Sequence, residues 1–156
     1  MLTMRGTPQI YYGTEILMKH PGSEAHGDLR ADFPGGWAGD EVNGFTGQGL
    51  SERERKAQAF VRKLLHWRKD RAVVHNGKTM HFRPEQGTYV YFRYDDSDTV
   101  MVALNKNHEA VELELARFAE RMQRHDRATD VISGDQKMLD VSISLPARSV
   151  TVLDLD

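Results

Sequence analysis

The chain of 156 residues carries a formal net charge of -2, with 39% hydrophobic and 28% charged residues. This composition predicts one soluble globular domain or slightly more, and it excludes disorder of the whole chain. A complete eight-unit α/β barrel is excluded as well, because that architecture needs about 250 residues. The sequence contains no cysteine, which excludes disulfide frameworks, thiolate catalysis and cysteine-bound zinc.

The charge and hydropathy patterns argue against a membrane-spanning protein and against a nucleic-acid-binding protein. No apolar run approaches the ~20 residues that a membrane-spanning helix requires, and the first ten residues lack the pattern of a signal peptide. Residues 51–71 carry eight Lys and Arg against three Asp and Glu, while the regions on both sides are net acidic. Because acidic flanks repel phosphate, this single basic stretch does not predict nucleic-acid binding.

The first expected element is a short strand at residues 9–12, bounded by Pro8 and Gly13. Its residues are β-branched or aromatic without clear polar alternation, which is typical of a strand covered on both faces in a parallel sheet. Such a strand needs neighbours on both sides. No second parallel-type strand with its crossover helix follows in the sequence.

Residues 19–50 contain eight of the thirteen glycines and show neither helical nor strand periodicity. A structureless stretch of about 30 residues is typical of a functional lid, a binding loop or a disordered segment. Phe33, Trp37 and Phe45 argue against a purely disordered linker.

Residues 51–71 predict an amphipathic helix. Ser51 and Glu54 have the spacing of a capping box, in which each side chain accepts a hydrogen bond from a backbone N–H at the helix start. The apolar residues recur at helical spacing, so one stripe is expected to pack inward while Arg and Lys face water. This stripe consists of Ala57, Phe60, Val61, Leu64 and Leu65.

From residue 78 onward the hydrophobic period changes to two, which predicts an antiparallel sheet or sandwich. A helical turn or short helix is expected at residues 115–122. The expected strands lie at residues 78–82, 88–94, 99–105, 110–113, 128–132, 138–143 and 149–155.

Neither a metal nor a cofactor is expected. The acidic run from Asp95 to Asp98 lacks the glycine and the terminal glutamate of a calcium-binding loop, and is interpreted as a solvated hairpin turn. The seven histidines show no pair at ligand spacing, which argues against a zinc site.

Several motifs in chain order resemble one known family. Residues 6–15, GTPQIYYGTE, closely resemble the motif on the eighth barrel strand of the α-amylase superfamily, glycoside hydrolase family thirteen. Residues 27–37 are most similar to the periplasmic neopullulanase and cyclomaltodextrinase type. The remaining similarities, to the last barrel helix and to the C-terminal β-domain, lie at residues 64–69, 72–82, 100–105, 129–134 and 145–150.

The resemblance implies an α+β fragment with two parts. Residues 1–71 would be the remnant of a catalytic (β/α)8 barrel, comprising its eighth strand, an active-site loop and its eighth helix. Residues 72–156 would be an all-β antiparallel C-terminal sandwich. It also implies a periplasmic or secreted full-length enzyme. Without barrel neighbours for the strand, residues 1–50 are expected to self-associate, fold back differently or be loosely ordered.

The resemblance implies an enzyme that hydrolyses α-glucans such as starch, pullulan, cyclodextrins or maltooligosaccharides. Retaining hydrolysis needs a nucleophilic carboxylate and an acid/base carboxyl about 5–5.5 Å apart. In the family these groups lie on barrel strands that precede the strand found here, so this chain has no expected catalytic residue. Tyr12 and Glu15 are assigned to the active-site wall. The fragment is expected to be inactive without the missing barrel.

The loop from His20 to Trp37 is the expected sugar-binding segment, with Arg30, Trp37 and Asp28 as substrate-binding residues. A guanidinium can donate paired hydrogen bonds to hydroxyls, and an indole can stack on a sugar ring. The family pattern places an aspartate four residues before the arginine. His26 occupies that position here, with Asp28 two residues before Arg30. The alternative is that Arg30 braces the loop by pairing with Asp28 or Asp32.

A second hypothesis makes the β-domain an independent starch- or carbohydrate-binding module. Strand alternation places Tyr89 and Tyr91 on one face and Tyr94 on the other, which allows a platform of two tyrosines. The alternative interpretation, which we favour, places this pair in the sandwich interior.

Overall fold

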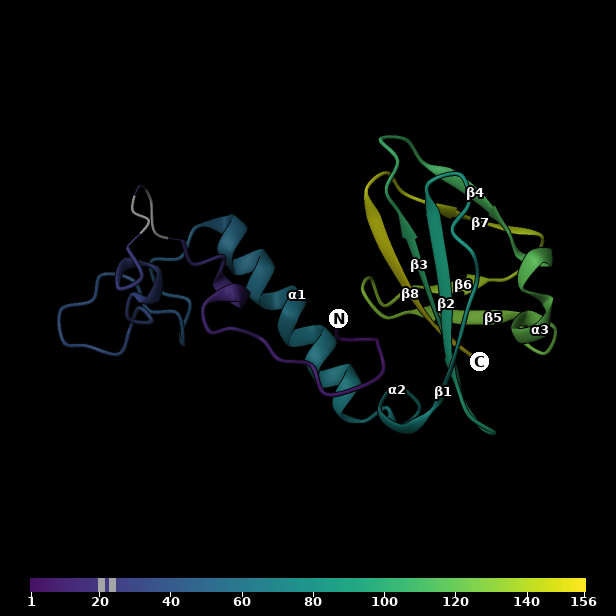
Figure 1. Cartoon of the computed structure of the whole chain (residues 1–156), viewed down its shortest axis with the longest axis horizontal. Helices are drawn as coiled ribbons and strands as arrows, with labels where there is room; N and C mark the ends of the chain where they lie inside the picture. Colours follow the sequence, from purple (N-terminus) through teal and green to yellow (C-terminus); the bar gives the residue numbers. More distant parts are fainter. Residues whose placement is uncertain (20–21, 23–24) are drawn as a thin grey trace. The chain divides into compact units, whose positions relative to one another are not determined.

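The structure is a computed structural model that describes residues 1–19, 22 and 25–156 (Figure 1). Part of the expected sugar-binding segment, including His20, lies outside the described residues. The chain divides into a β-unit, Met1–Thr7 with Leu64–Asp156, and a loop unit, Pro8–Lys63. The division at residue 71 implied by the family resemblance stays a prediction. Among the described residues, no helix combines the length and apolarity needed to cross a membrane.

The β-unit is an antiparallel sandwich. Six strands form one sheet in the order β1-β2-β3-β8-β5-β6, and β4 pairs with β7 in a second sheet (Figure 1). The strands are β1 (Lys78–His81), β2 (Thr88–Tyr94), β3 (Thr99–Asn105), β4 (Val111–Glu114), β5 (Arg127–Asp130), β6 (Gln136–Met138), β7 (Ser142–Leu145) and β8 (Ser149–Leu155).

The helices are few and mostly short. The long helix α1 (Glu52–Lys69) begins in the loop unit and ends in the β-unit. The β-unit also holds α2 (Ala72–Asn76), the 3-10 helix η3 (Leu115–Phe118) and α3 (Ala119–Met122), so the helical segment expected at residues 115–122 is confirmed. The loop unit holds the 3-10 helices η1 (Thr14–Ile16) and η2 (Asp28–Arg30).

The six-stranded sheet buries side chains on both faces. On its inner face, Val90 and Phe92 pack in one core with Leu113 and Ile143 of the second sheet and with Phe118 of η3. The outer face forms another core with the end of α1 and with α2. Burial on both faces explains why β2 and β3 read as nearly continuous apolar runs.

Three cross-strand rows make up the centre of the outer face, each with one residue from β2, β3 and β8. Because partners in register point to the same face, each row forms a line across the sheet. The rows are Arg93-Val100-Asp154, Tyr91-Val102-Val152 and Tyr89-Leu104-Val150.

A buried carboxylate fixes the end of α1 to the first of these rows. Asp154 Oδ2 accepts a hydrogen bond from Trp67 Nε1 at 3.2 Å and pairs with the guanidinium of Arg71. Arg71 also lies 3.7 Å from Asp98 at the start of β3. The pair therefore joins the junction between α1 and α2 to the central strands of the sheet.

Buried arginines satisfy backbone carbonyls beside this carboxylate. Arg68 in the last turn of α1 donates to Leu2 O at 2.6 Å and to Gly6 O at 3.1 Å, which ties the N-terminal segment to the helix. Arg93 donates to Val74 O at 3.0 Å and to the Thr79 hydroxyl. These contacts matter because an unpaired buried backbone carbonyl costs free energy comparable to a lost hydrogen bond.

Two expectations about strands and one about packing were wrong. Residues 9–12 do not form a strand, because no described segment supplies the neighbours that a parallel strand needs. The strand expected at residues 138–143 is two strands, β6 and β7, since the chain passes there from one sheet to the other. The α1 stripe is only partly covered: Leu64 is buried, whereas Phe60 and Leu65 remain exposed.

Two local motifs are confirmed. Ser51 N–H donates to Glu54 Oε2 at 2.7 Å, and Glu54 N–H donates to Ser51 Oγ at 3.3 Å, which completes the capping box. At the β2–β3 hairpin, Asp95 Oδ1 accepts hydrogen bonds from the backbone N–H groups of Ser97 and Asp98. These donors lower the pKa of Asp95, and the acidic run is the expected hairpin turn.

Removing the Asp154 carboxylate should destabilise the β-unit. We expect Asp154→Ala to lower its free energy of unfolding by about 2 kcal/mol, since hydrogen bonds to buried charged groups contribute roughly 1.5–3 kcal/mol. Urea unfolding followed by circular dichroism measures this change. The matched control is Asp140→Ala, which removes an exposed carboxylate and should change stability by less than about 0.5 kcal/mol. Equal effects of both substitutions would contradict the conclusion that Asp154 fixes the end of α1 to the sheet.

The capping box should appear in the titration of Glu54. Hydrogen bonds from Ser51 lower the pKa of Glu54, so its stabilising effect is present above the unfolded pKa and is lost as pH falls through the lower folded value. We expect Ser51→Ala to raise the Glu54 pKa, as measured by carboxyl-carbon NMR, while Ser51→Thr, which keeps a hydroxyl, leaves it low. An unchanged pKa in Ser51→Ala would refute this assignment.

Candidate functional site

A cavity of about 220 Å³ lies within the loop unit. It combines aromatic and aliphatic side chains with a carboxylate, an amine and a hydroxyl, which is the mixture expected for a ligand with both apolar and polar faces. The lining residues are Tyr11, Tyr12, Thr14, Met18, Lys19, Asp28, Leu29 and Ala31.

Two consecutive tyrosines form one wall of the cavity. The rings of Tyr11 and Tyr12 lie 4.7 Å apart between centroids and are tilted by 40°. The Tyr12 hydroxyl donates to Ala31 O at 3.0 Å, which connects this wall to the segment after η2. The hydrogen bond with Tyr11 raises the pKa of Tyr12.

Two of the predicted site residues lie close together at this cavity. Tyr12 and Asp28 both line it, although they are distant in sequence. Asp28 occupies the first position of η2 and Arg30 the last. Arg30 is exposed and is not part of the lining. Its role, whether in binding sugar or in bracing the loop, stays a prediction.

The remaining predicted site residues lie outside the lining. Glu15 is half-buried in η1, next to the buried Ile16. Trp37 is 68% exposed on a turn in which Asp40 Oδ2 accepts hydrogen bonds from Gly35 N at 2.7 Å and Trp37 N at 3.2 Å. The hydrogen bonds fix the backbone of this turn and leave the indole exposed to solvent. The roles assigned to Glu15 and Trp37 stay predictions.

Sequence reasoning missed several lining residues, chiefly Tyr11, Lys19 and Leu29. Tyr11 lies beside Tyr12 in the strand-like motif, and its position in an apolar run made it look like a core residue. Leu29 is 56% exposed within η2, and this exposure has no sequence signal of its own. The two adjacent tyrosines were the one sequence feature that indicated this cavity. If they do not lie in a strand, their rings must pack on other groups or face solvent.

Two turns that are joined by hydrogen bonds follow the cavity-lining segment in the chain. Gly44 N–H donates to Pro34 O at 2.8 Å, and Gln58 Nε2 of α1 donates to Gly44 O at 2.6 Å. Gly44 is buried, and a Cβ built there would lie 2.6 Å from the Phe33 ring. A side chain at position 44 would therefore displace the Phe33 ring. We call residues 33–50 the double turn.

The double turn should be sensitive to a methyl group at position 44 and tolerant of one at position 36. In Gly44→Ala the added Cβ clashes with Phe33, so faster amide exchange of residues 43–48 is expected. In Gly36→Ala the nearest atom is Phe33 O at 3.6 Å, an ordinary contact, so exchange should stay unchanged. Hydrogen exchange by NMR distinguishes the two. Equal exchange in both variants would show that packing at position 44 does not hold the turns together.

The two-tyrosine platform that the second hypothesis allowed does not form on the β-unit. Tyr91 is only 6% exposed, and its hydroxyl lies 2.6 Å from Thr3 Oγ1 in a buried hydrogen bond. Burial raises the pKa of Tyr91. Tyr89 is half-buried against the outer core, with its ring centroid 5.7 Å from that of Tyr91. The pair lies on the outer face of the six-stranded sheet and not in the sandwich interior, so the interpretation that we favoured was right about the burial of Tyr91 but wrong about the face.

The comparison with known sequences places the β-unit in one group of proteins. Residues 79–154 match the family model of the cyclo-malto-dextrinase C-terminal domain. A cyclomaltodextrin glucanotransferase of Klebsiella oxytoca is 29% identical over 105 residues, which cover 67% of this chain and 15% of that protein. The corresponding enzyme of Geobacillus stearothermophilus is 27% identical over 107 residues, covering 69% of this chain and 12% of that protein.

Solved structures share the fold. An AmyP variant in complex with maltotriose aligns with a TM-score of 0.74 at 19% identity, over 99% of this chain and 33% of that chain. An α-amylase of Anoxybacillus aligns with a TM-score of 0.73 at 16% identity, over 99% of this chain and 30% of that chain. The chain thus spans a small part of the curated relatives and about a third of these structures. The comparisons support an amylase-family C-terminal region for this chain, with residues 79–154 similar to the cyclo-malto-dextrinase C-terminal domain.

Proposed function

We propose that this chain is the C-terminal part of a retaining α-amylase-family glycosidase that acts on α-glucans such as starch, pullulan, cyclodextrins or maltooligosaccharides. The observation that carries the proposal is the family match of residues 79–154, which follows a segment with the motif GTPQIYYGTE at residues 6–15. We assign the enzyme to the neopullulanase and cyclomaltodextrinase type. By the same resemblance, the full-length enzyme is periplasmic or secreted.

The loop unit supplies binding groups in this proposal and no catalytic pair. Retaining hydrolysis needs two carboxyl groups about 5–5.5 Å apart. Among the described lining residues of the cavity, Asp28 is the single carboxylate. Glu15 is half-buried in η1 and does not line the cavity. The fragment should therefore bind sugar through Tyr12, Asp28 and the neighbouring loop without cleaving it.

The remaining barrel of the enzyme is the proposed partner of the β-unit. The outer-face row Tyr89-Leu104-Val150 is less covered than the rows beside it, with Leu104 and Val150 each 38% exposed. A recess of about 350 Å³ lies next to this row and is lined in part by Tyr89 and Leu104. Incompletely covered apolar sheet faces mark interaction sites. In the isolated fragment, the same surface would favour self-association.

The proposal predicts sugar binding without turnover. Incubation of the purified chain with pullulan, cyclodextrin and starch should release no reducing sugar, because the catalytic carboxylates are missing. In an NMR titration, maltotriose should shift the signals of the cavity-lining residues. Asp28→Ala should weaken this binding about tenfold, since one hydrogen bond to a charged group contributes roughly 1.5–3 kcal/mol.

The control for this titration is Asp140→Ala, which removes an exposed carboxylate from the β-unit. It should leave the affinity for maltotriose unchanged. Turnover by the purified chain would contradict the assignment of an inactive fragment. Absence of any maltotriose-dependent shift in the loop unit would contradict the assignment of a sugar-binding role.

A further inference from the structure

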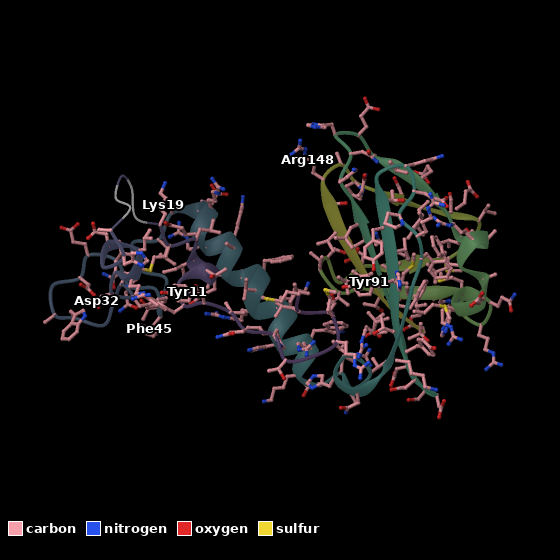
Figure 2. The ribbon with its side chains drawn as sticks, in the orientation of Figure 1. Tyr11, Lys19, Asp32, Phe45, Tyr91 and Arg148 are labelled. Atoms are coloured by element: carbon pink, nitrogen blue, oxygen red, sulfur yellow. The ribbon has the colours of Figure 1, made fainter. Side chains whose placement is uncertain are left out.

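We propose that Phe45 is an aromatic platform for an α-glucan chain, presented on the double turn together with Trp37. The inference rests on the proposed function for the class of ligand. Phe45 is part neither of the sequence motifs described above nor of the cavity lining. Figure 2 labels Phe45 together with Tyr11 and Asp32 of the same unit.

The first observation is that the Phe45 and Trp37 side chains are largely exposed to solvent. Phe45 is 67% exposed and Trp37 is 68% exposed. Phenylalanine has no polar atom that would gain from contact with water, and burial of its ring would stabilise the fold. The unit nevertheless keeps this ring outside while it buries Ile16 and Leu50. Exposed large apolar rings are a feature of binding surfaces.

The second observation is that the backbone under the ring is fixed. Asn43 Oδ1 accepts hydrogen bonds from Phe45 N at 2.9 Å and Thr46 N at 3.0 Å. Asn43 N–H donates to Gln48 O at 2.8 Å, and Gly47 N–H donates to Asn43 O at 2.8 Å. The turn therefore holds Phe45 in one position before any ligand arrives, which lowers the entropic cost of binding.

The third observation is that the Phe45 ring has a defined tilt. Its centroid lies 4.9 Å from that of Phe33, with an interplanar angle of 57°. Phe33 in turn contacts the position of Gly44. This contact supports one part of the Phe45 ring, while most of the ring surface stays accessible. Such an arrangement suits a planar ligand face that stacks on the open side.

The double turn also connects the two rings. The hydrogen bond from Gly44 to Pro34 O joins the turn that carries Phe45 to the segment before Trp37. Asp40 fixes the Trp37 turn through Gly35 N and Trp37 N. The turns that carry the two rings are therefore joined by backbone hydrogen bonds. A longer maltooligosaccharide offers more sugar rings for stacking on these side chains than a disaccharide does.

The surroundings of the rings favour a sugar over a protein partner. Exposed Asp40, Glu41 and Thr46 lie on the same double turn. The centre of a protein interface is depleted in charged residues. An α-glucan instead offers an apolar ring face and many hydroxyls, which match isolated aromatic rings within a polar loop.

The test compares substitutions that separate stacking from packing. Phe45→Leu keeps apolar volume against Phe33 but removes the planar face, whereas Phe45→Tyr keeps the ring. NMR titration of the 156-residue chain with maltoheptaose should show affinity about three- to tenfold lower for Phe45→Leu, the range expected for one aromatic stacking contact. Phe45→Tyr should stay within about twofold of the unsubstituted chain. Maltose should bind all three proteins with similar affinity.

The controls separate the possible failures. Val141→Ala removes an exposed apolar side chain from the β-unit and should not change maltoheptaose binding. Equal affinity of Phe45→Leu and the unsubstituted chain for maltoheptaose would overturn the Phe45 inference while leaving the proposed function intact. Failure of the unsubstituted chain to bind either sugar would overturn the proposed function itself. Loss of dimers on Phe45→Leu in sedimentation velocity, with sugar affinity unchanged, would overturn the inference and identify a second copy as the partner.

Discussion

The buried carboxylate of Asp154 is the interaction on which the arrangement of the β-unit depends. It lies on the outer face of a central strand, where an unpaired charge would be costly. The Trp67 indole and the Arg71 guanidinium compensate it. Because both partners belong to the junction between α1 and α2, compensation of the charge also fixes where the helices meet the sheet. Arg68 then extends this order to the N-terminal segment through two carbonyls.

The outer face consequently changes character from one row to the next. The row that contains Asp154 is covered by charged and aromatic groups, and the row that contains Tyr91 is covered through Thr3. The row of Tyr89, Leu104 and Val150 is more open. Within one unit, the same sheet face thus provides both an internal joint and an incompletely covered apolar strip. This gradient is the physical basis for proposing that the β-unit packs on a larger partner.

Sequence patterns predicted β2, β3 and β8 with their observed bounds, because these strands alternate between two buried faces and end at turn residues. The capping box at Ser51 was equally readable, since it depends on local spacing alone. The strand at residues 9–12 failed because a parallel strand depends on neighbours that no local pattern encodes. Phe45 was recognised as an argument against disorder, but its exposed position arises from tertiary turns and could not be predicted. Of the residues that line the cavity, Tyr12 and Asp28 were among those named from the sequence, while Tyr11 and Leu29 were not.

The two units are stabilised in different ways. The β-unit has a sandwich interior and an outer core, so its fold rests on burial of apolar area. In the described part of the loop unit, the buried apolar side chains are those of Ile16 and Leu50. Hydrogen-bonded turns therefore hold most of its backbone in place. Such turns can present Trp37, Phe45 and Tyr11 to solvent, which a unit dominated by its own core would bury. This difference supports the proposal that the loop unit binds sugar, while the β-unit, covalently joined to it through α1, provides a stable domain.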